Sequence, residues 1–178
     1  MDVPAQDRRE SAGRRGGRAE AEMTGPMPST DPTPAERAAP GDRDAYRAFR
    51  SIQTRWMDND IFGHMNNVVH YSLFDTAVNG WLVEAGVLDL AAGTQVGLVV
   101  ETGCRYFGEM AFPDVVTAGL RVARTGTSSV RYEVGLFRND ETRASAEGFF
   151  VHVYVDRATR RPAPLSPALR AALAALAV

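Results

Sequence analysis

The chain has 178 residues and a formal net charge of −2 at pH 7, and all 20 of its basic residues are arginine. It shows no strongly basic face, which argues against nucleic-acid binding, and no apolar run of the roughly 18 residues needed to span a membrane. The absence of lysine removes Schiff-base and lysine-base chemistry from the candidate mechanisms.

Residues 1–44 are rich in Arg, Ala, Gly, Pro, Ser and acidic residues and contain very few large apolar side chains. Such a segment cannot bury enough apolar surface to offset the entropy that it would lose on ordering. Its arginines are not followed by the apolar stretch of a signal peptide. We therefore predict a disordered N-terminal tail over residues 1–44 and one folded domain over residues 45–178.

Cys104 is the only cysteine, so neither an intrachain disulfide nor a thiolate metal cluster can form. The three histidines, His64, His70 and His152, do not have the spacing of a zinc motif. We expect no metal site and a reducing, cytoplasmic location.

The folded part begins with an edge-type strand pattern over residues 46–56, with Phe49, Ile52 and Trp56 as its apolar positions. A polar turn follows and leads into a helix from Val68 to about residue 86 that is apolar on almost every side. A helix with so little polar surface is normally buried on several sides. Its N-terminus directs backbone N–H groups and a partial positive charge toward the turn.

Beyond residue 93 the apolar pattern changes to a period of two, which is the period of a strand. Strands are predicted at residues 96–107, 116–123, 130–136 and 144–155, mostly joined by tight turns. Ser166 and Pro167 then begin a short amphipathic helix. Helices and strands that form separate runs predict an α+β fold, with an antiparallel sheet wrapped around one long central helix.

Two carboxylates, an imidazole and two amides surround one glycine in the polar turn: Asp58, Asp60, Gly63, His64, Asn66 and Asn67. One interpretation is an Asx-rich loop with a helix cap, because Asp and Asn favour both. The other is a catalytic site for a thioester. There Asp60 would attack or abstract a proton, and helix N–H groups would stabilise the charge that develops on the thioester oxygen.

The run Asp-x-Asp-x-x-Gly-His-x-Asn-Asn at residues 58–67, followed by Tyr71 and an apolar helix, resembles the 4-hydroxybenzoyl-CoA thioesterase family of acyl-CoA thioesterases. Residues 153–156 and 161–165 are similar to the way in which this family ends its last strand. The resemblance implies a hotdog fold and hydrolysis of a fatty or aromatic acyl-CoA without a cofactor. It also implies homodimers, or tetramers of dimers, in which two sheets join edge to edge.

By this resemblance the catalytic carboxylate is Asp60, acting either as a nucleophile or as a base that activates water. Gly63 would supply a backbone conformation closed to other residues. His64 could position Asp60 or a water molecule. One of Asn66 and Asn67 would cap the helix, and either could hold the substrate carbonyl.

Further residues are candidates for contact with the substrate. For Asp58, a structural hydrogen bond within the turn is the favoured alternative. Residues around Glu101 would line the acyl pocket of the partner subunit, and basic or hydroxyl groups near the strand turns would bind coenzyme A. The arginines near the strand turns can equally well be explained as solvated surface residues. The candidates are Asp58, Tyr71, Glu101, Arg124, Ser128, Ser129 and Arg131.

Two other functions fit the same fold. Hotdog hydratases resemble one another in an Asp five residues before a His, whereas Asn59 holds that position here and Asp60 lies four residues before His64. A non-catalytic acyl-CoA-binding module would keep the pocket without needing Asp60. A sensor of this kind should carry a DNA-binding segment, and residues 1–44 lack the helix periodicity to supply one.

Overall fold

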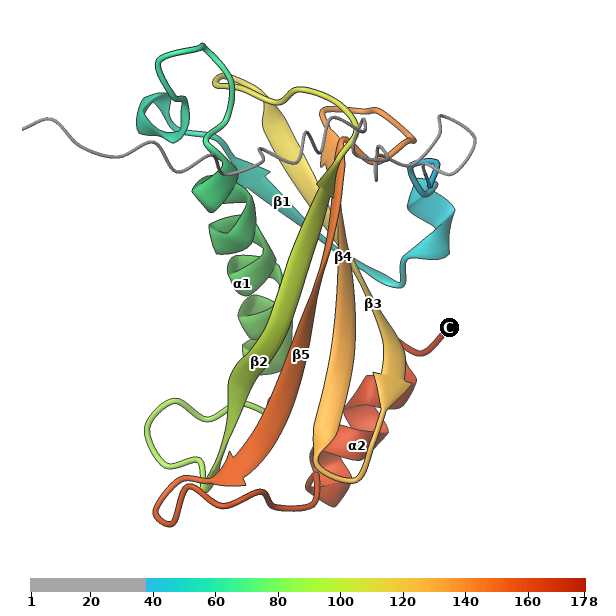
Figure 1. Ribbon diagram of the computed structural model, residues 1–178. Helices are drawn as coiled ribbons and strands as arrows, with labels where there is room; N and C mark the ends of the chain where they lie inside the picture. Colours follow the sequence, from blue (N-terminus) through green and yellow to red (C-terminus); the bar gives the residue numbers. More distant parts are fainter. Residues whose placement is uncertain (1–37) are drawn as a thin grey trace, which may run out of the picture. The chain divides into compact units, whose positions relative to one another are not determined.

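The long apolar helix lies across one face of a five-stranded antiparallel sheet, in a computed structural model that describes residues 38–178 (Figure 1). This is the predicted α+β arrangement. The elements in chain order are η2 (Arg43–Ala45), β1 (Ala48–Gln53), η3 (Trp56–Asp58), α1 (Asn67–Glu84), β2 (Gln95–Tyr106), β3 (Val115–Thr125), β4 (Ser129–Arg138), β5 (Ala146–Asp156) and α2 (Pro167–Ala174).

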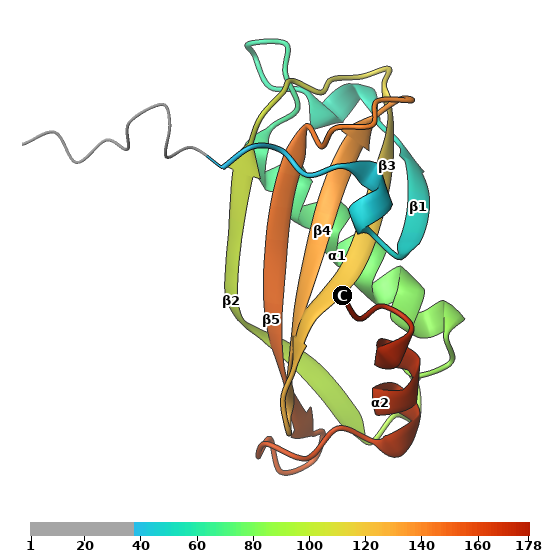
Figure 2. The same cartoon turned by 90° about the vertical axis from the view of Figure 1, so that its right-hand side faces the viewer.

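The strand order β1-β3-β4-β5-β2 leaves β1 and β2 as the two edges of the sheet (Figure 2). The edge strand predicted over residues 46–56 is therefore confirmed, although β1 is shorter because η3 follows it. In β2 the pairing with β5 shifts between Val99 and Glu101, as in a β-bulge. The neighbouring Leu98 and Val100 are 40% and 59% exposed. Among residues 38–178, the outer edge of β2 thus pairs with no strand, and it exposes apolar side chains around the irregular position.

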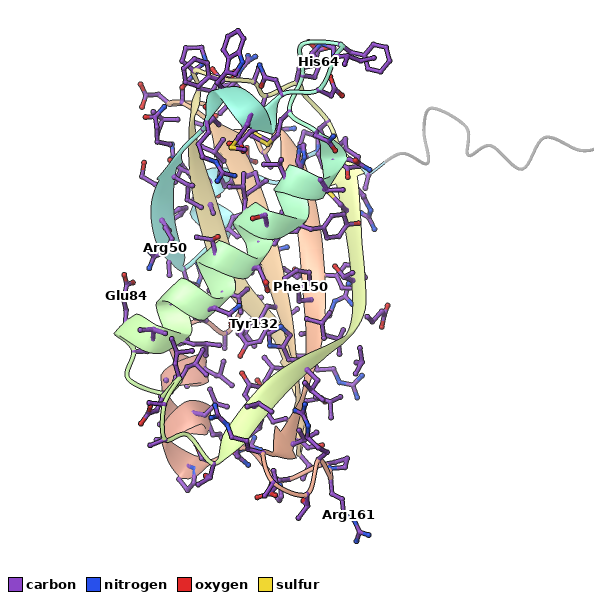
Figure 3. The ribbon with its side chains drawn as sticks, turned by 90° about the vertical axis from the view of Figure 1, so that its left-hand side faces the viewer. Arg50, His64, Glu84, Tyr132, Phe150 and Arg161 are labelled. Atoms are coloured by element: carbon purple, nitrogen blue, oxygen red, sulfur yellow. The ribbon has the colours of Figure 1, made fainter. Side chains whose placement is uncertain are left out.

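One side of α1 packs on the sheet and forms the centre of the core. Phe74 is fully buried and meets the ring of Phe150 edge-on, with 6.2 Å between the ring centroids. Figure 3 shows Phe150 and Tyr132 on the sheet behind the helix. The side chains of Ser72 and Asp75 are exposed. In the single chain the helix is therefore covered on one side only, and not on several sides as its composition suggested.

Gly148 of β5 lies directly beneath Phe74. A Cβ at this glycine would overlap the Phe74 ring and would come 2.9 Å from the backbone oxygen of Gly103. The absence of a side chain at this position is what lets α1 approach the sheet closely.

The second helix begins where Ser166 caps it, with Ser166 Oγ accepting a hydrogen bond from Leu169 N at 3.2 Å, as predicted. Leu169, Leu173 and Leu176 are buried in the same core as α1. Among residues 38–178, no helix combines the length and the apolar character that crossing a membrane requires.

The predicted boundary of the tail at residue 44 is too late. Gly41 N donates to Glu147 Oε1 at 3.2 Å, and Arg43 N donates to Thr142 O at 2.8 Å, so both residues are attached to the sheet region. These hydrogen bonds join segments about a hundred residues apart, and local composition gives no sign of them. The remainder of the predicted tail, residues 1–37, lies outside the described residues.

Candidate active site

The polar turn before α1 closes on itself at one end of the sheet, where Figure 3 labels His64. Asn59 and Met65 pair as an isolated antiparallel bridge, and Asp60 N donates to His64 O at 2.8 Å. Gly63 has a φ of 84°, a conformation that glycine adopts without the penalty of a side chain. The turn therefore has the backbone shape for which its glycine was singled out.

The carboxylate of Asp60 is oriented by its own turn. Its Oδ1 accepts hydrogen bonds from Phe62 N at 2.8 Å and from His64 N at 3.4 Å. Within residues 38–178, its Oδ2 accepts none. The side chain is half-buried. Asp60 thus holds one oxygen fixed and keeps the other open to a reactant.

The start of α1 lies immediately after this turn. Asn66 is the capping residue, since its Oδ1 accepts from Val68 N at 3.2 Å. Asn67 is exposed as the first helical residue, and its N–H donates to no acceptor in the described part of the chain. His70 lies one turn further along, where burial lowers the pKa of its imidazole. Its ring packs edge-on against Tyr106 with 4.9 Å between centroids.

Asp58 is buried and has its own partner. Its carboxylate accepts from Arg55 N at 2.7 Å and from the Arg55 guanidinium at 2.8 Å. Burial by itself would raise the pKa of the Asp58 carboxyl, but these hydrogen bonds outweigh it and hold the pKa below its ordinary value. Both oxygens are engaged, which favours the structural interpretation of Asp58 over contact with substrate.

The imidazole of His64 points away from Asp60. Its Nε2 lies 3.3 Å from Glu109 Oε2, and both side chains are at least half exposed. Only the backbone N–H of His64 reaches the Asp60 carboxylate. The arrangement gives no support to the prediction that the His64 ring positions Asp60.

Large apolar side chains surround the turn and face outward. Ile61 is 93% exposed, Phe62 76% and Trp56 81%. The Trp56 ring meets Phe112 edge-on, with 6.0 Å between centroids. An exposed apolar surface of this kind is typical of a place where another molecule binds.

The remaining substrate candidates are spread over the molecule. Tyr71 packs edge-on against Phe74 at 5.7 Å, on α1, and Glu101 is exposed on β2. Arg131 lies 3.6 Å above the ring of Phe149, on the face of the sheet opposite α1. The single chain does not assemble these three residues with Asp60.

The β3–β4 hairpin carries the candidates Arg124, Ser128 and Ser129, and it lies at the end of the sheet opposite Asp60 (Figure 1). Ser128 O accepts from Tyr154 N at 2.7 Å, and Tyr154 pairs with Gly97 near the start of β2. Strands rise roughly 3.3 Å per residue, and β3 has 11 residues. These candidates therefore cannot reach Asp60 of the same chain.

Sequence reasoning missed the residues that hold the turn in place. Met65 N donates to Met110 O at 2.7 Å, and Phe112 N donates to Asn59 Oδ1 at 2.9 Å. Pairings between such distant segments leave no local signal. Arg55 was also missed, although its spacing of three residues from Asp58 could have indicated a capping interaction.

Several cavities lie away from the turn. One of about 270 Å³ includes Arg121, Arg131 and Glu133 on the face opposite α1. Another, of about 410 Å³, lies beside the C-terminal part of α1. Between residues 38 and 178, no group of three or more His, Cys, Asp or Glu side chains is placed to hold a metal ion.

The comparisons with known proteins identify a family. The chain matches the family model of the thioesterase-like superfamily over residues 54–173. No curated protein matches it. It is 51% identical to the PA5185 protein from Pseudomonas aeruginosa strain PAO1, with a TM-score of 0.76 over 79% of this chain and 97% of that one.

Two other solved structures are each 28% identical to this chain. The PA2801 protein from Pseudomonas aeruginosa matches with a TM-score of 0.67, over 72% of this chain and 98% of that one. A thioesterase from Thermus thermophilus, complexed with coenzyme A and Zn, matches with a TM-score of 0.63, over 75% of this chain and 96% of that one.

Proposed function

The chain belongs to the thioesterase-like superfamily and has the hotdog fold, and from this premise we propose that it hydrolyses an acyl-CoA thioester, with Asp60 as the catalytic carboxylate. The proposal rests on the hydrogen bonding of the Asp60 carboxylate. One of its oxygens is fixed by two backbone N–H groups and the other is open, directly before the N-terminus of α1.

The helix start supplies the complementary group. The N–H of Asn67 is an open donor there, with no acceptor among residues 38–178, and the helix dipole adds partial positive charge. A thioester carbonyl whose oxygen lies against this N–H gains stabilisation as negative charge develops on that oxygen. The reaction needs no cofactor.

Asp60 can act by either of two reaction routes. As a base, it takes a proton from water while the water oxygen attacks the carbonyl carbon. The C–S bond then breaks, and the thiolate of coenzyme A takes up the proton. As a nucleophile, it displaces the thiolate and forms a mixed anhydride. Water then cleaves the anhydride, which restores the Asp60 carboxylate and releases the proton that the thiolate takes up. Both routes give a carboxylic acid and free coenzyme A.

Coenzyme A as the carrier group is supported by the Thermus thermophilus thioesterase, which is complexed with coenzyme A. We assign its binding to the hydroxyl and guanidinium groups of the β3–β4 hairpin, including Arg124 and Ser128. In one chain these groups lie at the wrong end of the sheet, so the assignment requires a second copy.

We propose that this second copy pairs along the β2 edge. Leu98, Val99 and Val100 are all at least 40% exposed there, beside unpaired backbone groups. An antiparallel partner would place its Gln95 end next to Tyr106 and α1 of the first chain. The partner's β3–β4 hairpin would then approach Asp60, and the active site would include residues from both copies.

Asp60→Asn tests the proposal, because the amide has nearly the same shape but is a poor base and nucleophile. We expect turnover of acyl-CoAs to fall by about 10²- to 10⁴-fold, with the fold and oligomeric state unchanged. The measurement is thiol release from short, long and aromatic acyl-CoAs. Retention of most of the turnover would remove Asp60 from the mechanism. Binding of acyl-CoA without cleavage by the unmodified protein would instead favour a non-catalytic binding module.

A further inference from the structure

The cavity of about 410 Å³ has the dimensions of a binding site for a small molecule, which typically occupies about 300–1,000 Å³. It lies at the end of the sheet opposite Asp60, between α1, the start of β2 and α2 (Figure 1). Its walls combine aliphatic side chains, including Leu82, Val87, Leu88, Val96 and Leu169, with polar ones such as Asn79, Thr94, Gln95 and Ser166.

Among the polar residues of this lining, His152 of β5 is distinguished by its burial. Its side chain is 3% exposed, and neither ring nitrogen has a hydrogen-bond partner among residues 38–178. Burial lowers the pKa of the imidazole and so favours the neutral ring, while the charge of Asp75 opposes this effect. A buried polar group without a partner destabilises the fold. Such a group in a native protein calls for an explanation.

His152 lines the cavity from within a cluster of aromatic rings. The ring stacks on Phe150 at 5.9 Å and meets Tyr132 edge-on at 5.1 Å. A Cβ at Gly97 would lie 2.9 Å from Nδ1, so the close approach of β2 to the ring depends on the glycine. Protein atoms cover both nitrogens, so a ligand reaches one of them only when the ring turns about χ2, a broad torsion in histidine.

The exposed part of the cavity lining includes a positively charged side chain, that of Arg157. Arg157 is exposed and donates one long hydrogen bond, 3.4 Å, to Leu90 O. The nearby carboxylate of Asp89 accepts backbone N–H groups of Ala91 and Ala92, both at 2.9 Å. The guanidinium of Arg157 is therefore open to an anionic group that enters the cavity.

We propose that this cavity binds a medium-length aliphatic acid or acyl group whose far end carries a hydroxyl group that hydrogen-bonds to His152. A neutral imidazole offers one donor and one acceptor, and a hydroxyl group matches both. The aliphatic chain fits the walls, and a free carboxylate would meet Arg157. The aliphatic ligand could arrive as a free acid or as the acyl part of a thioester that is bound at a partner's active site.

Calorimetry with the full chain tests the proposal, using 8-hydroxyoctanoic acid and octanoic acid as probes. We expect the hydroxy acid to bind about tenfold more tightly, which corresponds to about 1.4 kcal/mol. His152→Phe should make the two affinities equal, and Leu88→Trp should abolish binding of both acids by filling the cavity. Val153→Phe, on the opposite face of β5, is the control and should keep the tenfold preference.

Failure of both acids to bind the unmodified protein would overturn the proposal, and so would a tenfold preference that persists in His152→Phe. If His152→Phe does not fold, His152→Leu makes the same comparison. These measurements require no thioester cleavage, so they decide the proposal even if the proposed function fails.

A kinetic measurement then distinguishes whether the aliphatic ligand is a free acid or the acyl part of a thioester. The ratio of kcat/KM for 8-hydroxyoctanoyl-CoA and octanoyl-CoA is compared between the unmodified protein and His152→Phe. A ratio that changes assigns the cavity to the acyl part of the substrate. An unchanged ratio, together with altered acid binding, assigns it to a free acid.

Discussion

At one end of the sheet, the turn that holds Asp60 keeps one carboxylate oxygen fixed by backbone N–H groups and exposes apolar side chains, with Ile61 93% and Phe62 76% exposed. At the other end, the arrangement is reversed. Aliphatic side chains line a cavity there, and His152 is buried without a hydrogen-bond partner among the described residues. The first end thus exposes apolar side chains, and the second buries a polar one.

This contrast indicates that the two ends complement each other. Under the proposed antiparallel pairing of β2, each end of one copy lies beside the unlike end of the other. The exposed apolar side chains around Asp60 would then be covered, and the hairpin groups at the opposite end would face a reacting thioester. Substitutions in the middle of the sheet and in the Asp60 turn can test this comparison between the two ends.

The largest effect is expected from Gly148→Ala, which tests whether a rigid middle separates the two ends. A methyl group there would overlap the Phe74 ring and crowd the backbone of Gly103. We expect a loss of about 3 kcal/mol in the free energy of unfolding, the upper end of the usual cost of overpacking. Urea denaturation measures it.

Gly108→Ala is the matched control for this substitution. Its added Cβ would find its nearest neighbour, Ser145, at 3.6 Å, which is an ordinary contact. The change should stay within about 0.5 kcal/mol. Equal losses at Gly148 and Gly108 would show that close packing of Phe74 does not fix the middle of the sheet.

A smaller effect is expected from Asp58→Asn, which removes the charge that anchors the Asp60 turn. We expect a loss of about 2 kcal/mol at pH 7, because hydrogen bonds to a charged group are broken or weakened. The pKa of Asp58 is lowered in the folded protein, so its contribution is present above the ordinary value of 3.8 and is lost as pH falls through the folded value.

The acid dependence supplies the check on that interpretation. The difference in unfolding free energy between the unmodified protein and Asp58→Asn should shrink below about pH 4. A difference that stays constant from about pH 7 to about pH 2 would mean that packing, and not the Arg55–Asp58 ion pair, is what the substitution disturbs.

The smallest loss of stability is expected from Gly63→Ala. Its φ of 84° disfavours a side chain by about 1–2 kcal/mol, although no atom lies within 4 Å of the added Cβ. Gly86→Ala, at a φ of 69° and with equally open space, should cost a similar amount. Turnover should fall more in Gly63→Ala, because that turn orients Asp60. Equal turnover in both variants would contradict this.

The sequence predicts the helix and the strands well because their signals are local. The predicted helix from Val68 to about residue 86 lies within two residues of the observed Asn67–Glu84 at each end. The polar turn and its glycine were also identified correctly. The position of Arg124 and Ser128 relative to Asp60 was not predictable in the same way, because it depends on strand length and on the order of strands in the sheet.

The cavity escaped the sequence analysis for a related reason. His152 alternates with Phe150 and Tyr154, which gives it a place on the core face of β5. That pattern is visible in the sequence. Nothing in it shows that the core leaves a space beside the ring, since the space is formed by α1, β2 and α2 together.

The shift in pairing between Val99 and Glu101 restricts how two copies can be joined. A two-fold axis at Val100 would set residues 95–99 of one chain opposite residues 101–105 of the other, with both irregular positions at the crossing point. Any other alignment would put an irregular position within a continuous ladder. Under the proposed pairing, this single extra residue would favour one register of the partner strand, where a regular strand would accept several.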